Sequence, residues 1–205
     1  MGDILRRRQL MLAEASLPEW DYEWDYTKGL PTETGWTKET NKTTSEVIES
    51  TYLKVTSGGG SSNYIRYVNS NYLTNKGVIE VDFAGVTSSN TIFYISISDG
   101  TNGLSVRSYY TNSYKGIYLG DASSIANCTK LITSSKATIR YVVKLVIDNG
   151  YGDVYINNTL SASNIDLSTI VNSYTLTQFR FSNNSTGSGS VTGRFYSVKV
   201  KVGRI

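Results

Sequence analysis

Apolar and polar residues alternate along the C-terminal third of the chain. Residues 138–148 (TIRYVVKLVID) are rich in β-branched and aromatic side chains, contain no proline, and are followed by Asn149-Gly150. This dipeptide readily adopts the positive φ angles of a two-residue hairpin turn. Asp153–Asn157 is predicted as the returning strand, and Asn157-Asn158 as the next turn. The pattern therefore predicts a β-hairpin.

The same alternation recurs along most of the chain and indicates sheets with one buried and one solvated face. Trp20–Lys28 opens the β region, and strands are predicted at Trp36–Glu39, Glu46–Thr56, Asn63–Val68, Gly77–Phe83, Thr91–Ser98, Leu104–Tyr110, Gly116–Leu119, Leu176–Phe181 and Gly193–Val202. About twelve strands at these intervals are typical of an antiparallel β-sandwich. No internal repeat or interior linker divides residues 20–205, so we predict a single all-β domain there.

Residues 1–19 have a different pattern. Apolar residues at helical spacing, with Asp3 as the N-cap and Pro18 as the end, predict a short N-terminal helix over Asp3–Ala15. A helix of about thirteen residues is marginal alone in water, so it needs a partner surface. That surface is either the helix's own sandwich or a docking or oligomerisation partner. Because Glu14 interrupts the apolar run, the segment does not resemble a secretory signal.

The amino-acid composition excludes several kinds of catalytic and metal-binding site. The 205 residues include one cysteine, Cys128, and no histidine. Cys-His and Ser-His-Asp catalysis and histidine-rich zinc sites are therefore excluded. A chain of this length can bury about 70% of its unfolded surface, so it needs no disulfide.

Charge and aromatic content bear on the partner. The net charge of +3 is too small to require a nucleic acid, and no aromatic-plus-basic stripe follows Arg6-Arg7-Arg8. No apolar run is long enough to span a membrane. Sixteen tyrosines against five phenylalanines favour strands whose exposed faces contact polar, ring-shaped ligands.

Four segments carry a family resemblance: GVIEVDF, YISISDGTNGLSVRSYY, YVVKLVIDNGYGDVYINNTL and FRFSNNSTGSGSVTGRFYSVKVKV. Their order resembles the concanavalin A-like lectin/glucanase superfamily, and its laminin-G-like branch is the most similar. The resemblance covers about Tyr22 to Arg204 and implies a jelly roll of two antiparallel sheets, one with a concave face. The segment DILRRRQLMLAEA resembles the N-termini of phage structural proteins.

Glucanases of this superfamily carry a Glu-x-Asp-x-(x)-Glu strand. Two carboxylates must flank the scissile bond of a glycoside. Glu80 and Asp82 lie on one face of a predicted strand, but Ala84 and Gly85 stand where the third acid is expected. This departure puts hydrolysis in doubt, and pairing with Lys or Arg is the competing role for both carboxylates.

Loop carboxylates raise the possibility of calcium, which supports loops in several relatives of this fold. Asp148 and Asp153 flank the NGYG turn, and Asp99, Asn102 and Asp121 lie in other loops. Asp beside Gly is also the commonest way to form a turn. We therefore assign no metal or cofactor, with calcium as the alternative.

The function expected from sequence is a non-catalytic, lectin-like carbohydrate-binding module of a phage virion or other extracellular assembly, exported without a signal peptide. Its partners are a polysaccharide or cell-surface glycan and, through the N-terminal helix, a virion protein or further copies of itself. The predicted ligand residues are Asp99, Asn102, Tyr109, Tyr110 and Tyr114, with Trp24 and Trp36 as reserves better suited to the core. The alternatives are a glycoside hydrolase or lyase using Glu80 and Asp82, and a virion component without a glycan ligand.

Overall fold

The computed structural model describes residues 19–41, 44–58, 63–85, 91–98, 103–110, 115–120, 128–133, 138–169, 176–185 and 189–205. These residues form β-strands and a few short 3₁₀ turns. The strands are β1 (Tyr22–Asp25), β2 (Thr37–Thr40), β3 (Thr44–Ile48), β4 (Leu53–Ser57), β5 (Asn63–Thr74), β6 (Lys76–Gly85), β7 (Thr91–Ser98), β8 (Gly103–Tyr110), β9 (Lys115–Gly120), β10 (Thr129–Thr133), β11 (Tyr141–Asp148), β12 (Tyr151–Ile156), β13 (Thr159–Asp166), β14 (Leu176–Ser185) and β15 (Val191–Val202). The 3₁₀ turns are η1 (Tyr26–Lys28), η2 (Pro31–Thr34) and η4 (Leu167–Thr169).

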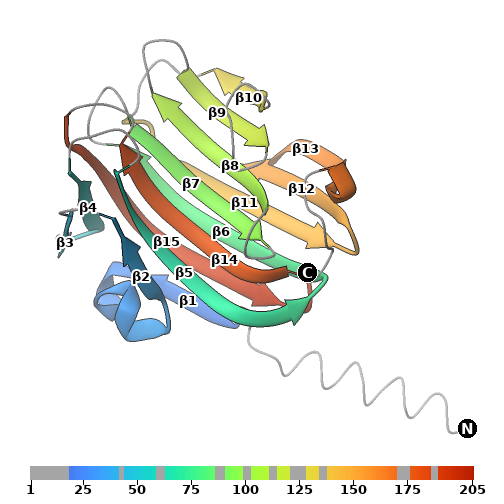
Figure 1. Cartoon of the computed structure of the whole chain (residues 1–205), viewed down its shortest axis with the longest axis horizontal. Coiled ribbons are helices and arrows are strands. Elements are labelled where there is room, and N and C mark those ends of the chain that lie inside the picture. The colour runs from blue at the N-terminus through green and yellow to red at the C-terminus, as the bar shows by residue number, and fades with distance from the viewer. Residues whose placement is uncertain are drawn as a thin grey trace, which may run out of the picture.

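Two antiparallel sheets form a sandwich (Figure 1). Sheet A has the order β13-β12-β11-β6-β15-β4-β3, with β1 paired to β15. Sheet B has the order β10-β9-β8-β7-β14-β5-β2. The predicted all-β antiparallel sandwich is therefore confirmed.

The last two strands of the chain lie inside the sheets rather than at their edges. β14 pairs with β5 on one side and with β7 on the other. β15 pairs with β6 and β4 and also holds β1. Each sheet thus contains, between two earlier strands, one of the last two strands in the sequence: β14 in sheet B and β15 in sheet A.

The predicted turns are present. Asn149 and Gly150 have φ angles of 48° and 90°, and they connect β11 to β12. Asn157 and Asn158, at 50° and 63°, connect β12 to β13. Asparagine tolerates this left-handed region better than most residues, so the sequence fixes both hairpins locally.

An aromatic cluster joins the two sheets at the centre of the core. The Phe181 ring of sheet B stacks on Tyr67 at a centroid distance of 4.8 Å and meets Trp36 edge-on at 4.9 Å. It also meets Phe195 of sheet A at 4.9 Å. Trp24 and Trp36 are 0% and 3% exposed, which confirms their expected place in the core.

Buried polar contacts also connect the sheets. The side-chain amide of Asn183, on β14, donates to the backbone carbonyls of Val55 and Val191 in sheet A, each at 3.3 Å. Ser57 Oγ in turn donates to the backbone carbonyl of Asn183 at 2.7 Å. At one edge Tyr67 Oη donates to Glu46, which also pairs with Lys38 Nζ at 2.6 Å. Burial and the Glu46 bond raise the pKa of Tyr67, so the phenol stays protonated.

The sequence-based description differs from the structure in three places. The segment Glu46–Thr56 was expected to be one strand, but it is the hairpin β3-β4, turned at Glu49, whose N–H donates to the Tyr52 carbonyl. Strands β10 and β13 were not predicted, because both are mostly polar, partly exposed edge strands with a weak apolar signal.

The predicted helix Asp3–Ala15 lies outside the described residues. In the described part of the chain, no helix has the length and hydropathy needed to cross a bilayer.

Candidate functional site

The outer face of sheet B, the face turned away from sheet A, is built from polar residues. Ile95, Ile97 and Val106 point into the core, so strand alternation turns Ser96 and Ser105 outward. The same alternation applies to β5, β9 and β14. One sheet thus presents an apolar surface to the core and hydroxyl, amide and guanidinium groups on its other side.

One row of residues crosses every strand of this face. Backbone register places its members side by side, and we call them the cross-strand row: Glu39, Arg66, Ser182, Tyr94, Arg107, Tyr118 and Lys130. With strands about 4.8 Å apart, the row is about 29 Å long. Basic residues and tyrosines dominate it, although its members are far apart in the sequence.

The neighbouring row carries mostly small side chains. Arg180 is in register with Ser96, which is followed by Ser105 and Gly120. Ser105 Oγ donates to the Gly120 carbonyl at 2.8 Å. Cys128 lies against this end of the sheet, because a Cβ on Gly120 would be only 2.6 Å from its sulfur. The Cys128 sulfur, which forms no disulfide, is thus closely packed beside Gly120.

Arg107 is the most deeply placed cation of the cross-strand row. Its side chain is 1% exposed, and its Nε donates to Ser105 Oγ at 3.2 Å. Tyr118, its neighbour in register, is 6% exposed and has Lys130 Nζ 5.8 Å from its ring centroid. The Arg107 guanidinium therefore lies beneath this part of the face rather than on its surface.

Arg180 and Gln178 form a second polar pair on β14, in the middle of the sheet. Both side chains are half-buried. The Arg180 Nε donates to Gln178 Oε1 at 2.8 Å, and its Nη2 donates to the same oxygen. Gln178 therefore fixes the plane of the guanidinium.

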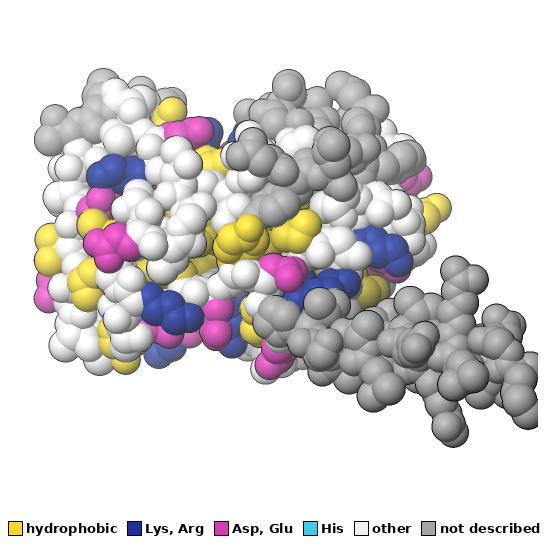
Figure 2. All heavy atoms as spheres, turned by 90° about the horizontal axis from the view of Figure 1, so that it is seen from below, with side chains coloured by type: hydrophobic (Ala, Val, Ile, Leu, Met, Phe, Trp, Pro, Cys, Tyr) yellow, Lys and Arg dark blue, Asp and Glu magenta, His cyan; other side chains and the backbone are white. Residues whose placement is uncertain are grey.

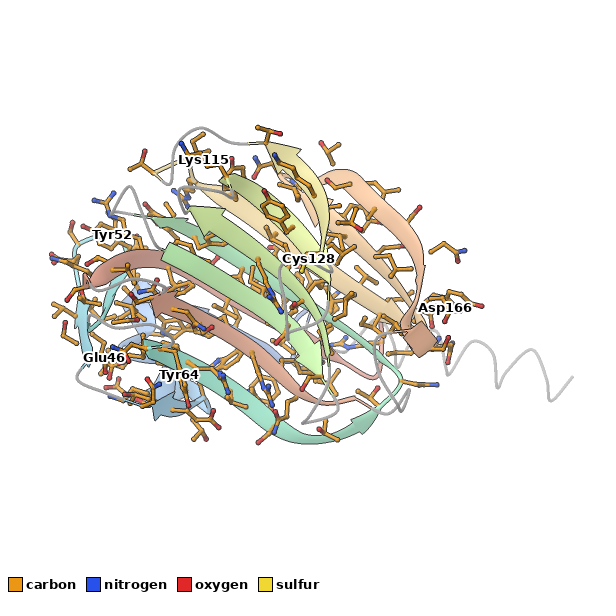
Figure 3. All side chains as sticks on the ribbon, turned by 45° about the horizontal axis from the view of Figure 1, so that its top comes forward. Glu46, Tyr52, Tyr64, Lys115, Cys128 and Asp166 are labelled. Carbon is orange, nitrogen blue, oxygen red and sulfur yellow. The ribbon has the colours of Figure 1, made fainter. Side chains whose placement is uncertain are left out.

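The β5 side of the face carries Tyr64 and Arg66. The Arg66 guanidinium lies 4.6 Å from the Tyr64 ring centroid and pairs with Glu39 at 3.2 Å. Tyr64 and Cys128, both labelled in Figure 3, mark two sides of the face. Its accessible cations are therefore spread over the sheet rather than gathered at one point.

Carboxylates are missing from the outward positions that the structure describes on the five inner strands of sheet B. By register and alternation these are Tyr64, Arg66, Val68 and Ser70; Gln178, Arg180, Ser182 and Asn184; Ser96 and Ser98; Gly103, Ser105 and Arg107; and Gly116, Tyr118 and Gly120. The acid of the cross-strand row, Glu39, is on the edge strand β2. The face can thus donate many hydrogen bonds but offers few anionic groups.

The ligand residues predicted from sequence fall mostly outside this description. Asp99, Asn102 and Tyr114 are not among the described residues. Tyr109 and Tyr110 end β8, where the backbone pairs them with Gly116 and Lys115 of β9. Their role in binding stays a prediction.

Glu80 and Asp82 lie on the outer face of the other sheet. Asp82 is held by Arg140, whose Nε and Nη2 donate to its two oxygens at 2.7 and 2.6 Å. That hydrogen bond raises the pKa of Arg140. Glu80 is in register with Lys144 on one side and Lys199 on the other. Cations thus surround both carboxylates.

Two hollows of about 430 Å³ each open on the outer face of sheet A, and they share Val146 and Ile205. One contains the calcium candidates Asp148 and Asp153. Asp148 pairs with Lys76 at 3.0 Å, and Asp153 accepts the Asn164 N–H at 2.8 Å. Within the described ranges no three Asp, Glu, Cys or His side chains gather as metal ligands, and Asp121 lies outside those ranges.

Sequence reasoning missed the cross-strand row and the Arg180–Gln178 pair. Alternation correctly predicts which residues of a strand face outward, but it cannot predict the order in which the strands pair. Arg66, Arg107 and Lys130 each stand alone in the sequence, so no local basic stripe is visible. The only available signal is that each cation interrupts an apolar-alternating segment.

Comparisons with known proteins bear on the fold. No protein-family model and no curated protein matches the sequence. Solved structures do match. A Crh5 transglycosylase has a TM-score of 0.69 at 10% identity, over 88% of this chain and 83% of that one. The Emp46p carbohydrate recognition domain has a TM-score of 0.61 at 12% identity, over 92% and 100%.

A sialidase matches with a TM-score of 0.64 at 13% identity, covering 89% of this chain but only 19% of the sialidase. The chain therefore corresponds to a small part of that protein. These similarities confirm a jelly-roll β-sandwich of the kind found in carbohydrate-binding and glycoside-active proteins, consistent with a concanavalin A-like fold. At 10–13% identity they carry information on the fold alone.

Proposed function

We propose that this chain is a non-catalytic carbohydrate-binding module whose polysaccharide ligand lies on the outer face of sheet B. The observation that carries the proposal is the composition of the partly exposed part of that face, along β5 and β14, where Tyr64, Arg66, Gln178, Arg180 and Asn184 stand without a carboxylate among them. Such groups suit sugar hydroxyls, which accept and donate hydrogen bonds in turn.

The arrangement of acids supports binding without cleavage. Hydrolysis by glycosidases uses two carboxylates on either side of the scissile bond. Glu80 and Asp82 lie on the opposite sheet, and Asp82 is engaged by Arg140 in a two-pronged ion pair. The structural neighbours include a carbohydrate recognition domain as well as a transglycosylase, so they support a carbohydrate ligand in either case.

Individual contacts between a sheet face and sugar hydroxyls are weak, so useful binding calls for several copies. The proposal therefore includes an extracellular assembly, such as a phage virion, in which residues 1–19 bring modules together. Support for this part is the sequence of that segment alone, with its helical spacing and basic start. Sedimentation of the intact chain, against a chain lacking residues 1–19, tests it, because loss of oligomers on truncation is expected.

The test of the binding face uses two matched tryptophan substitutions. Ser70→Trp places an indole beside Gln178 on the partly exposed part of the sheet B face, and Ser163→Trp fills a hollow on the other face. Glycan-array binding should be lost in Ser70→Trp and kept in Ser163→Trp, with equal thermal midpoints showing that both fold. The reverse pattern would move the site to sheet A. Release of reducing sugar that disappears in Glu80→Gln would show a glycoside hydrolase instead.

A further inference from the structure

We infer that Asn149-Gly150 is a deamidation site whose reaction the folded chain suppresses, and that its conversion irreversibly separates two neighbouring hairpin turns. These are the turn between β11 and β12 and the turn between β5 and β6. The inference does not depend on the proposed glycan ligand. It rests on the hydrogen bonds that join the two turns.

The dipeptide carries both reacting groups. The backbone nitrogen of Gly150 can attack the side-chain carbonyl carbon of Asn149, because glycine has no Cβ to obstruct the approach. The new N–C bond closes a cyclic imide, the Cγ–Nδ2 bond breaks, and the side-chain nitrogen leaves as ammonia with the proton that Gly150 loses. Water then opens the ring to aspartate or isoaspartate, so a neutral side chain becomes an anion.

In the folded chain the Asn149 side chain is held at both of its polar atoms. Asn75 Nδ2 donates to its Oδ1 at 2.6 Å, and its own Nδ2 donates to Asp148 Oδ1 at 2.7 Å. The Asn149 N–H also donates to the Asn75 carbonyl at 3.0 Å. We call these three bonds the turn–turn contact. Closing the imide moves the amide away from Asn75 and Asp148, so both side-chain bonds must break first.

The backbone of the turn is held as well. Asn149 and Gly150 have φ angles of 48° and 90°, as a two-residue hairpin turn requires, and the Leu167 N–H donates to the Gly150 carbonyl at 2.9 Å. Asn75 and Asn149 are both exposed, so the turn–turn contact can open locally without unfolding the core. The reaction is therefore slow in the closed turn and proceeds when the turn opens.

Conversion changes the chemistry of the contact. The Asn149 Nδ2, a donor to Asp148, is replaced by an oxygen that only accepts. Two carboxylates then meet beside Lys76, which already pairs with Asp148 at 3.0 Å. Like charges at this separation repel, so the bond to Asp148 is lost. Isoaspartate also lengthens the backbone, which a two-residue turn cannot accommodate.

The experiment follows conversion of the intact chain by peptide mass spectrometry at mildly alkaline pH, in buffer and in urea. Asn149 should convert about 10- to 30-fold more slowly in buffer than in urea, because two side-chain hydrogen bonds must break first. Asn102-Gly103, the other Asn-Gly dipeptide of the sequence, reports the rate of the same chemistry in urea. Asn75→Ala removes one of the bonds, so conversion of Asn149 in buffer should rise by about 3- to 10-fold.

Two control variants separate the turn–turn contact from a general loss of stability. Ser161→Ala removes a similar exposed hydrogen bond, 3.1 Å long to the Thr159 carbonyl, and should leave the rate within about two-fold. Phe181→Ala weakens the core without touching either turn and should accelerate conversion less than Asn75→Ala does. Equal acceleration in Phe181→Ala and Asn75→Ala would mean that global unfolding controls the reaction, which overturns the role of the contact.

Separation of the turns is tested with Asn149→Asp, which reproduces the aspartate product. Hydrogen exchange of the residue 149 N–H should become about 3- to 10-fold faster, because its bond to the Asn75 carbonyl opens more often. Adding Asp148→Asn to this variant restores one carboxylate and one amide, so exchange should slow again.

Each remaining result also decides the inference. Equal conversion of Asn149 in buffer and in urea would show that the fold gives no protection. Conversion of Asn102 in urea without conversion of Asn149 would overturn the site itself. Unchanged hydrogen exchange in Asn149→Asp would overturn the separation of the two turns.

Discussion

The two outer faces of the sandwich share one core but handle charge in opposite ways. On sheet A, acids and bases are interspersed and satisfy one another: Asp82 with Arg140, and Asp148 with Lys76. Remaining cations there lie over rings, as Lys144 does over Tyr155 at 4.3 Å. Figure 2 shows the same mixing of signs on the side seen from below.

The described outward positions of the five inner strands of sheet B carry arginines next to small hydroxyl-bearing side chains, and Glu39 on the edge strand β2 pairs with Arg66. The two faces therefore differ in how evenly acids are distributed over them. Charges that pair within the molecule protect a surface from other partners, which is the arrangement on sheet A. Polar character alone would not distinguish the faces, since both are polar.

Shortening a side chain in the shared core should destabilise both sheets together and have the largest effect. Phe181→Ala removes a fully buried ring that contacts Trp36, Tyr67 and Phe195. We expect the free energy of unfolding to fall by about 3–5 kcal/mol. Urea denaturation followed by tryptophan fluorescence measures it. Tyr155→Ala, on the half-buried outer face of sheet A, should cost far less, and similar losses in the two variants would contradict the shared core.

An acid introduced on sheet B should make it resemble sheet A. Ser70→Glu sets a carboxylate beside Gln178 and near Arg180, where it can pair with the guanidinium. Affinity for the proposed polysaccharide ligand should fall by about ten-fold, or ~1.4 kcal/mol, since the new acid competes with sugar hydroxyls for the donors of this part of the face. Isothermal titration calorimetry measures it, and Ser163→Glu on sheet A is the control. An unchanged affinity would mean that the ligand lies elsewhere.

Breaking an ion pair on sheet A should affect stability slightly and binding not at all. Arg140→Gln removes both hydrogen bonds to Asp82 and the contact with the Tyr196 ring at 3.8 Å. Because Arg140 is largely exposed, the cost should be at most about 1 kcal/mol. Thermal unfolding and polysaccharide titration together check this. A clear loss of glycan affinity would show that the sheet A face also contacts ligand.

The smallest effect is expected at Asp25, away from both faces. The Thr27 hydroxyl donates to its carboxylate, which lowers the Asp25 pKa. A depressed folded-state pKa stabilises the protein above the unfolded pKa of about 4, and this contribution is lost as pH falls through the folded value. Thr27→Ala should return the Asp25 pKa towards its ordinary value. NMR titration of the carboxyl carbon measures the shift, and an unchanged midpoint would contradict the assignment.

Alternation and turn chemistry predicted much of the fold. Asn149-Gly150 and Asn157-Asn158 define their hairpins through local backbone preference alone, so the sequence suffices there. Edge strands such as β10 and β13 escaped prediction because they bury little apolar surface. The proposed binding face could not be predicted, since Arg66 and Arg107 fall in one row only through β14 and β7 between them, and pairing between distant strands depends on the whole sandwich.

The placement of β14 and β15 has a consequence for synthesis on the ribosome. Strand β7 has no hydrogen-bonded link to β5 until β14 arrives between them, and β6 has none to β4 until β15 arrives. A nascent polypeptide can therefore form hairpins early, yet its two layers stay incomplete until roughly the last thirty residues emerge, as expected for a topology dominated by distant contacts.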